Sequence, residues 1–285
     1  MGVESFIPQQ WSGNLLTRLH ENLIISSLCN RDYEGEVSQS GDRVRVNMVS
    51  GQSASAYTPN STTLTYGQLD GAPVYVDINR RYYAAFYIDD LDKRQAKGDV
   101  VGEGTKELGF ALAKEMEVYI ASLYGQAQVV AGLGTEAAPI DVTSLNVTEY
   151  LGLVAQGLDN ANVPTEGRWF VCRPWFLHKI ELADITLNTN NTTTVQNGFR
   201  GNYLGFNIFV SNNISRNSSS NDKTRNLAGY MGSITLAQQI PLTVEAMRDP
   251  INAFRDLVRA LNVYGAKVIR PDTLACLRAD YTAEP

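Results

Sequence analysis

The sequence predicts an α+β protein. Two observations indicate this class. Alternating apolar and polar residues mark short strands at 44–48 and 74–78, and an apolar stripe in helical phase runs through residues 99–124. The 285 residues can bury one large core or two smaller ones, so neither disulfides nor a metal is needed for stability.

The composition excludes several classes of function. A formal net charge of −6 argues against tight binding of DNA by the whole surface, which needs a basic stripe. Cys29, Cys172 and Cys276 are far apart in the sequence and odd in number, so we expect buried thiols in a reducing cytoplasm. No apolar run approaches 18 residues, and the first residues lack the pattern of a signal peptide. We therefore expect no membrane partner.

The first part of the chain combines a helix, short strands and a long connection. Apolar residues spaced by four after Pro8 predict a helix that ends near residue 25. The connection 49–73 is rich in Ser, Thr, Gly and Tyr and has no periodicity, which is unusual inside a compact domain. It is either a mobile surface loop or an arm that becomes ordered on a neighbour. Residues 82–90 then predict a buried strand that enters an acidic turn.

Residues 99–124 form the clearest helix, with about 35 Å of length at the usual rise per residue. Its apolar side keeps helical phase over six turns. The polar side is expected to carry five charged residues: Glu103, Lys106, Glu107, Lys114 and Glu117. Gly125 is the expected C-cap of this helix.

In the second half, the pattern reads helix, strand, helix. Asn146 is expected to cap a helix that extends to Leu158, Trp169–Cys172 is a short core strand, and Pro174 opens a helix that continues through Leu182. The Asn-rich stretch 186–226 favours turns, with a strand only at 206–210.

The remaining stretches are mostly extended. Short strands are expected within 227–236, and residues 242–248 alternate apolar and polar. Residues 254–261 fit a helix, whereas 263–269 suggest strands, and a final short element covers 274–281.

No catalytic set can be assembled from these residues. The two histidines, His20 and His178, supply no nucleophile triad, and no metalloprotease or nucleotide-binding motif is present. The acidic cluster Asp89, Asp90 and Asp92 could hold a divalent cation, but carboxylates there could equally cap the following helix or form ion pairs. Because the basic pair Arg80 and Arg81 precedes this cluster, we interpret the two ends as intersubunit pairing partners.

Several stretches together resemble the major capsid (coat) proteins of tailed bacteriophages. They lie in the same order along nearly the whole chain, and their combination carries the resemblance: Phe6–Ser12, Asn30–Gly35, Gly41–Val44, Ile88–Asp92 and Phe254–Pro271.

The resemblance implies the major capsid protein fold, in four regions. Residues 1–33 look like the N-terminal arm, and 34–79 like the extended E-loop hairpin. Residues 80–130 and 242–285 look like the peripheral P-domain with its long spine helix, and 131–241 like the axial A-domain. For 254–269 the family favours strands, and we adopt strands because sheet pairing can override a weak local pattern.

The implied function is self-assembly into hexamers and pentamers of an icosahedral shell around the double-stranded DNA of a tailed phage. The implied location is the virion, with assembly in the host bacterial cytoplasm. The chain is then not an enzyme and needs no cofactor. Its implied partners are other copies of itself, a separate scaffolding protein, a portal protein, a possible decoration protein, and packaged DNA contacted without sequence specificity.

Ten residues are candidates for contacts between subunits. They are Trp11, Arg45, Tyr57, Tyr66, Arg80, Arg81, Asp89, Asp90, Asp92 and Lys93. Three other interpretations remain open at this point. The chain could form an encapsulin-like nanocompartment shell loaded with an enzyme, a soluble metal-dependent enzyme that uses the acidic cluster, or a tail or fibre protein.

Overall fold

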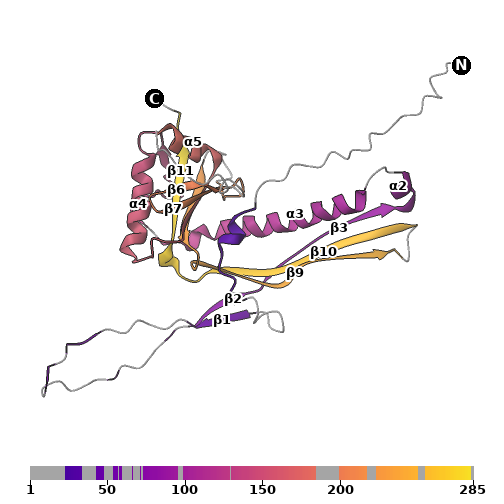
Figure 1. The fold of residues 1–285 in the computed structure, drawn as a ribbon, viewed down its shortest axis with the longest axis horizontal. Coiled ribbons are helices and arrows are strands. Elements are labelled where there is room, and N and C mark those ends of the chain that lie inside the picture. Colours follow the sequence, from indigo (N-terminus) through magenta and orange to yellow (C-terminus); the bar gives the residue numbers. More distant parts are fainter. Residues whose placement is uncertain are drawn as a thin grey trace.

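The protein consists of an elongated layer attached to a compact sheet (Figure 1). The computed structural model describes residues 23–33, 43–47, 54–56, 58–59, 66, 71, 73–95, 99–128, 130–183, 199–216, 223–249 and 254–283. Most of the expected N-terminal helix and most of the connection 49–73 lie outside these residues. Within the described ranges, no helix is both long and apolar enough to cross a membrane.

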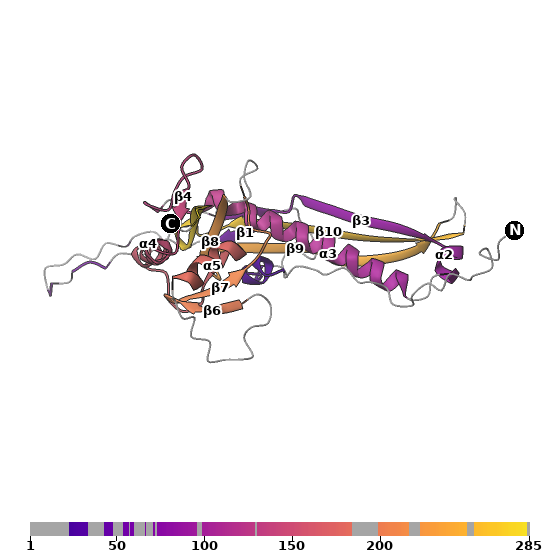
Figure 2. The ribbon, with the colours of Figure 1, turned by 90° about the horizontal axis from the view of Figure 1, so that it is seen from above.

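The elongated layer is a three-stranded antiparallel sheet with one long helix on it. Its strands follow the order β3 (Arg80–Asp89), β10 (Arg255–Val268) and β9 (Ile234–Arg248). Helix α3 (Val100–Ala121) runs along these strands in both perpendicular views (Figures 1 and 2). The strand adopted for 254–269 is confirmed, because β10 pairs with a strand on each side.

Helix α3 covers only one face of this sheet. Leu108 and Leu112 of α3 pack on Val258 and Ala260 of β10, and Phe86 of β3 borders this cluster. The approach is close, since a Cβ added to Gly104 of α3 would lie 2.6 Å from the ring of Phe86. The side chains that point away from α3 have no cover within the described chain.

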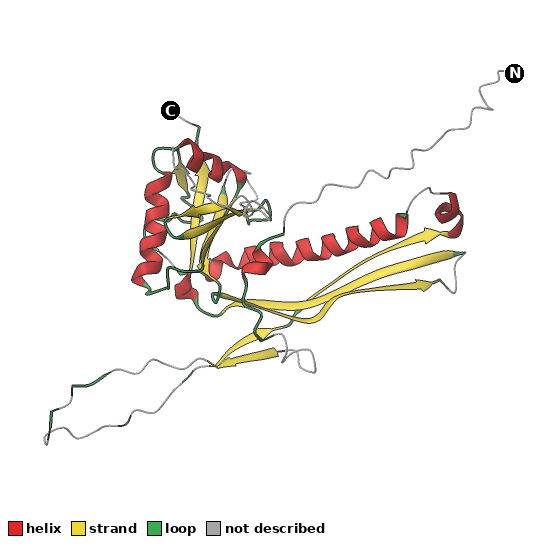
Figure 3. Cartoon of the chain, viewed as in Figure 1, coloured by secondary structure: helices red, strands yellow, loops and turns green. Residues whose placement is uncertain are grey.

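The compact part is a six-stranded sheet in the order β4-β11-β8-β5-β7-β6. In that order its strands span Ile140–Val142, Leu274–Tyr281, Thr224–Tyr230, Arg168–Cys172, Phe206–Val210 and Phe199–Tyr203. Helices α4 (Val147–Asn160) and α5 (Pro174–Leu182) flank it (Figures 1 and 3).

Both faces of this sheet are buried, which explains why every residue of β5 is buried. Phe170 and Cys172 point into the core shared with α4 and α5. Trp169 and Val171 point into a second core, which contains Met116 and Ile120 of α3. The second core therefore joins the compact sheet to one end of the elongated layer.

A small hairpin is attached where the two parts meet. Strands β1 (Arg43–Asn47) and β2 (Pro73–Asp77) pair antiparallel, which confirms both predicted strands. Val44 and Val76 pack with Ala237 of β9 and Val263 of β10. The hairpin base is thus held by the long sheet, and the connection 49–73 leaves from it.

Four expectations need correction. Strand β3 is half exposed rather than buried, because only alternate residues face α3. The α-helix ends at Ala121 and continues as the 3-10 helix η3 (Ser122–Gln126), so Gly125 is not its C-cap. Asn146 occupies the N-cap position of α4, but its side chain bonds Thr143 and Asp141 instead of the helix. The Asn-rich stretch 186–226 contains a second strand, β6, and the first residues of a third, β8.

Candidate functional site

The uncovered face of the three-stranded sheet is the first candidate surface. Tyr83 and Tyr87 of β3 point away from α3 and are 80% and 64% exposed. Tyr83 lies opposite Leu261 of β10, and both Leu261 and Met247 of β9 are exposed large apolar residues. We call Tyr83, Tyr87, Met247, Leu257 and Leu261 the open face. These side chains lie on either side of the exposed Arg259–Glu245 ion pair on the same face. Several exposed large apolar residues gathered on one face of a sheet are typical of a protein contact surface.

The acidic cluster and Lys93 lie at the far end of the elongated layer, on β3 and the short helix α2 (Asp90–Gln95). Asp90 forms an ion pair with Arg248 of β9. Lys93 Nζ lies 2.9 Å from Asp256 Oδ2 of β10. This contact raises the pKa of Lys93 and lowers the pKa of Asp256. Asp90 and Lys93 thus hold α2 against the ends of two strands within one chain.

The structure brings the acidic residues to one end but does not pair them with Arg80. The Arg80 guanidinium instead lies 4.2 Å from the ring centroid of Tyr119 on α3, and a hydrogen bond to Tyr119 raises the pKa of Arg80. Arg81 is exposed on the same side of β3 as Tyr83. No group of three His, Cys, Asp or Glu residues in the described ranges could hold a metal ion.

The remaining candidates lie at or near the hairpin. Arg45 is exposed in the middle of β1, opposite Tyr75 of β2. Tyr66, in the connection between the two strands, is 90% exposed. Trp11 and Tyr57 lie outside the described residues. The intersubunit role of all ten candidates stays a prediction.

Glu117 holds the segment near residue 25 against α3, although the helical pattern predicts an exposed position for it. The periodicity puts it on the polar side of α3, but its side chain is fully buried. Its Oε1 accepts hydrogen bonds from the backbone N–H of Ile24 at 2.9 Å and of Ile25 at 3.1 Å, and from the hydroxyl of Ser211 at 3.3 Å. A negative charge is favourable there, because Ile25 begins the 3-10 helix η2 (Ile25–Leu28). Glu117 therefore fastens the segment at residue 25 to α3.

In the sequence, only the small residues next to Glu117 on the helix indicate that its side chain is buried. Ala113 and Ala121 lie four residues before and after Glu117 on α3, and small side chains there allow another segment to approach closely. Sequence reasoning missed the anchor because the partners are backbone N–H groups more than 90 residues away.

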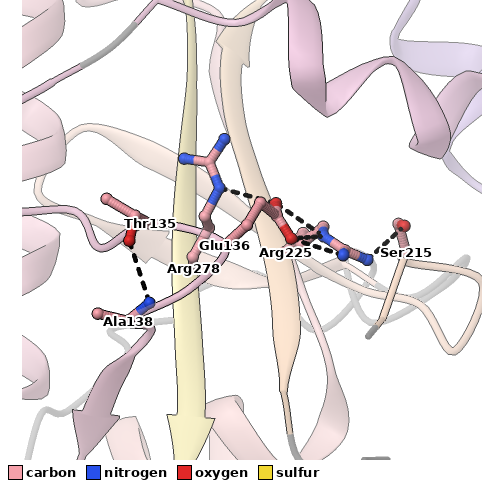
Figure 4. A network of polar contacts seen from close by, with 6 residues as sticks. All are labelled: Thr135, Glu136, Ala138, Ser215, Arg225 and Arg278. Carbon is pink, nitrogen blue, oxygen red and sulfur yellow. Dashed lines mark hydrogen bonds and ion pairs between the residues drawn. The ribbon is translucent and has the colours of Figure 1, made fainter. Parts of the chain in front are cut away.

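A second polar network lies in the compact part (Figure 4). Glu136 of the loop before β4 lies between two arginines: Arg225 Nη2 of β8 is 2.6 Å from its Oε2, and Arg278 Nε of β11 is 2.9 Å from its Oε1. The contact with Arg225, supported by Arg278, lowers the pKa of Glu136. Arg225 also donates to Ser215 and stacks on Tyr124. The network ties the loop to two neighbouring strands.

A long sheet with one covered face, a spine-like helix and a compact sheet at one end now allow comparison with known proteins. The family model for phage capsid protein matches residues 76–278. The chain belongs to the phage capsid protein family. The match runs through both sheets and α3, so the major capsid protein fold is confirmed by sequence as well as by shape.

Solved structures agree with this membership. A chain from Mycobacterium phage Che8 is 26% identical to this capsid protein, with a TM-score of 0.76 over 95% of this chain and 96% of that chain. A chain from the capsid of cyanophage P-SCSP1u is 20% identical, with a TM-score of 0.75 over 99% and 95%. One from the capsid of Ralstonia phage GP4 is 12% identical and has a TM-score of 0.71 over 98% and 96%.

No curated protein matches the capsid protein. Family membership makes the protein a structural component of the virion and favours self-association into a shell. Among the described residues, the open face is a candidate surface for that association.

Proposed function

We propose that this capsid protein assembles into hexamers and pentamers of an icosahedral shell that encloses the double-stranded DNA genome of a tailed phage. The observation that carries the proposal is the open face, since a long sheet with one uncovered apolar side is stable in water when another molecule covers it. Closed symmetry lets many such contacts, each modest alone, hold a container together.

The regional division of the subunit is part of the proposal. Residues 1–33 act as an arm, and 34–79 form the E-loop that lies over a neighbour. Residues 80–130 with the long strands β9 and β10 form the P-domain, and 131–233 belong to the A-domain. Two boundaries change from those expected. Strand β9 begins at Ile234 and pairs with β10, so 234–241 move to the P-domain. Strand β11, within 242–285, hydrogen-bonds with β4 and β8, so we assign it to the compact sheet of the A-domain.

The proposed partners follow from the same role. Shell closure at the correct size uses a separate scaffolding protein, and one vertex takes a portal protein. A decoration protein could bind the outside of the shell. The packaged DNA is contacted without sequence specificity, and the net charge of −6 suits a container that must release its genome. Assembly takes place in the host bacterial cytoplasm.

The test is the assembly state of the purified protein, expressed alone and together with the proposed scaffolding protein. Size-exclusion chromatography followed by negative-stain electron microscopy should show closed shells, or rings of five and six subunits. A protein that stays monomeric in both preparations would overturn the proposal. Shells that carry an enzyme and never a genome would identify a nanocompartment instead.

A further inference from the structure

Strand β3 is a long edge of the elongated layer, with no described strand on its outer side. It is the first strand of the order β3-β10-β9, and it runs along one border of the layer (Figure 2). Its 10 residues pair with β10 in one continuous register. The other edge, β9, contains Pro241 and pairs with β10 through register shifts. Proline and irregular pairing protect an edge from further strands, and β3 has neither device.

The backbone groups of alternate β3 residues point out of this edge. The N–H of Asp90 donates to the carbonyl oxygen of Phe254 at 2.8 Å, so the even-numbered residues of β3 bond to β10. In an antiparallel ladder the residues between them turn their N–H and C=O groups the other way. These outward groups belong to residues whose side chains are exposed on the open-face side, namely Arg81, Tyr83, Ala85 and Tyr87. The edge therefore offers donors and acceptors to a further strand.

The two ends of β3 carry opposite charges. Arg81 lies near its start and Asp89 at its end, and no charged residue lies between them on the strand. Among the described residues, no ion pair involves Arg81. Asp89 also interacts within its own chain, but a carboxylate with two oxygens accepts from further donors. Arg255, opposite Asp89 on β10, has its own partner, since its Nη2 lies 2.6 Å from Asp249 Oδ2. A strand with one sign of charge at each end is complementary to a copy of itself that runs in the opposite direction.

We propose that β3 pairs antiparallel with β3 of a second copy, across a two-fold axis at Ala85, and that the two three-stranded sheets become one. The inference rests on the proposed function and adds a contact between two subunits that face each other across a two-fold axis of the shell. Arg81 then lies opposite Asp89 of the second copy, and the same pair forms again on the other side of the axis, as an isologous contact requires. Arg259, opposite Ala85 on β10, is paired with Glu245 at 2.7 Å and leaves the middle of the contact without net charge.

The backbone and the side chains select the same register. The outward groups belong to odd-numbered residues, so only registers that place odd-numbered residues opposite each other form hydrogen bonds. Of these, the register centred at Ala85 forms both charge pairs, and the neighbouring registers centred at Ala84 or Phe86 lose both. The register at Ala85 also places Tyr83 opposite Tyr87 of the second copy, and aromatic cross-strand pairs stabilise a sheet. Hydrogen bonds and tyrosines hold the contact, and the charges fix its register.

The test is a disulfide cross-link on the proposed axis. Opposed residues of a hydrogen-bonded antiparallel pair have Cα atoms about 5.5 Å apart, a distance that a disulfide spans. Oxidation of the Ala85→Cys variant, in shells or in concentrated solution where a variant forms none, should give a covalent dimer on a non-reducing gel. The three native cysteines are buried and do not compete. Absence of the dimer would overturn the proposal.

Tyr83→Cys and Tyr87→Cys are the matched controls for the register. Either variant alone should give no dimer, because its two equivalent cysteines lie four residues apart along the paired strands, or about 13 Å. A mixture of the two variants should give the dimer, since residue 83 of one copy lies opposite residue 87 of the other. A dimer from either variant alone, or none from the mixture, would overturn the register.

Charge reversal tests the pairing of the strand ends. In the Ala85→Cys background, Arg81→Asp or Asp89→Arg alone places like charges opposite each other, and the dimer yield should fall at least about fivefold. An equal mixture of the two variants should restore the dimer, because each copy supplies the charge that the other lacks. Arg270→Asp, which reverses an exposed charge outside β3, is the control and should keep the yield. Equal yields from Arg81→Asp and Arg270→Asp would overturn the pairing, also where Asp89→Arg impairs folding.

Shell formation separates this inference from the proposed function. Shells of Ala85→Cys that give no dimer on oxidation would overturn the two-fold contact and leave the proposed function intact. Failure of the wild-type protein to form shells concerns the proposed function alone, because cross-linking in concentrated solution still reports whether two β3 edges meet.

Discussion

Glu117 shows how one buried carboxylate can position a whole segment. Its Oε1 accepts the N–H groups of Ile24 and Ile25, and it also reaches Ser211. Replacing Glu117 by Ala would leave these buried donors without an acceptor. We expect the free energy of unfolding to fall by about 3 kcal/mol, measured by urea denaturation of the unassembled subunit.

Glu115→Ala is the control, because Glu115 is an exposed residue two positions away on the same helix. Its effect should stay within about 0.5 kcal/mol. Glu117→Gln should be intermediate, since the amide keeps one oxygen acceptor. Equal stability of all three variants would contradict the anchoring role.

Glu136 gives the protein a defined pH response. Contacts with Arg225 and Arg278 lower its pKa in the folded state relative to the unfolded chain. The stabilisation is therefore fully present above the ordinary carboxyl pKa and is lost as the pH falls through the lowered value. The difference in unfolding free energy between the wild type and Glu136→Gln should shrink as the pH falls from neutral towards the acid limit.

Denaturation of the wild type and the Glu136→Gln variant across this range measures the effect. The Glu149→Gln variant, which removes a carboxylate from the first turn of α4, serves as a comparison. A difference for Glu136→Gln that stays constant across the range would show that its ion pairs do not contribute as inferred.

At the scale of elements, Gly265 controls how closely the hairpin approaches the long sheet. A Cβ at this position of β10 would overlap the carbonyl oxygen of Asp77 and lie 3.1 Å from the Cα of Ile78. Both are backbone atoms, so no side-chain rotation can relieve the overlap. Gly265→Ala should lower the free energy of unfolding by about 2 kcal/mol.

Gly152→Ala is the matched control for Gly265→Ala. Gly152 lies inside α4, and its added Cβ would meet no atom within 4 Å. Alanine there should be neutral or stabilise the protein by up to about 1 kcal/mol, because it favours the helix. Equal losses of unfolding free energy in Gly265→Ala and Gly152→Ala would show that the close approach of the hairpin to β10 does not explain the loss.

The open face should matter for assembly and little for the single subunit. Tyr83→Ser/Tyr87→Ser changes side chains that are mostly exposed and point away from α3. We expect a stability change within about 1 kcal/mol, but a strong loss of shells in negative-stain images. Leu145→Ser, at an equally exposed position outside the elongated layer, is the comparison. Normal shell yield from the double variant would remove the open face from the assembly contacts.

The sequence predicts most elements but not the surroundings of every residue. Helix α3 and strands β1 and β2 follow from their periodicity, and β5 follows from its short apolar run. Strand β10 does not, because residues 254–261 fit a helix locally, and pairing with β3 and β9 decides their conformation. Strand β6, with Gly201 and Asn202, has weak strand propensity and forms by pairing with β7.

The site was harder to predict for a related reason. Aromatic residues on both sides of β3 read as a buried strand, yet one side is covered by α3 and the other is the open face. Local sequence marks an apolar surface, but it does not say whether the same chain covers it. The stacking of Arg80 on Tyr119 was missed likewise, since it joins elements that are separate in the sequence.

At the scale of the whole molecule, electrostatic repulsion between subunits opposes assembly. Every copy carries a net charge of −6, while the open face presents tyrosine, leucine and methionine side chains on either side of the Arg259–Glu245 ion pair. Salt screens the repulsion and leaves apolar contacts intact. Light scattering of the purified protein should therefore show assembly at a lower protein concentration when NaCl is raised. Weaker assembly at high salt would indicate that ion pairs dominate the contacts.

The position of β11 has a consequence for synthesis on the ribosome. This strand lies between β4 and β8 in the compact sheet, although about 130 residues of chain separate it from β4. At the usual rate of translation β4 waits roughly ten seconds or more for its partner. Until then the nascent chain cannot complete the sheet that supports one end of α3. We therefore expect unfinished copies on a polysome not to nucleate shells, so that the concentration of released chains decides when a shell begins.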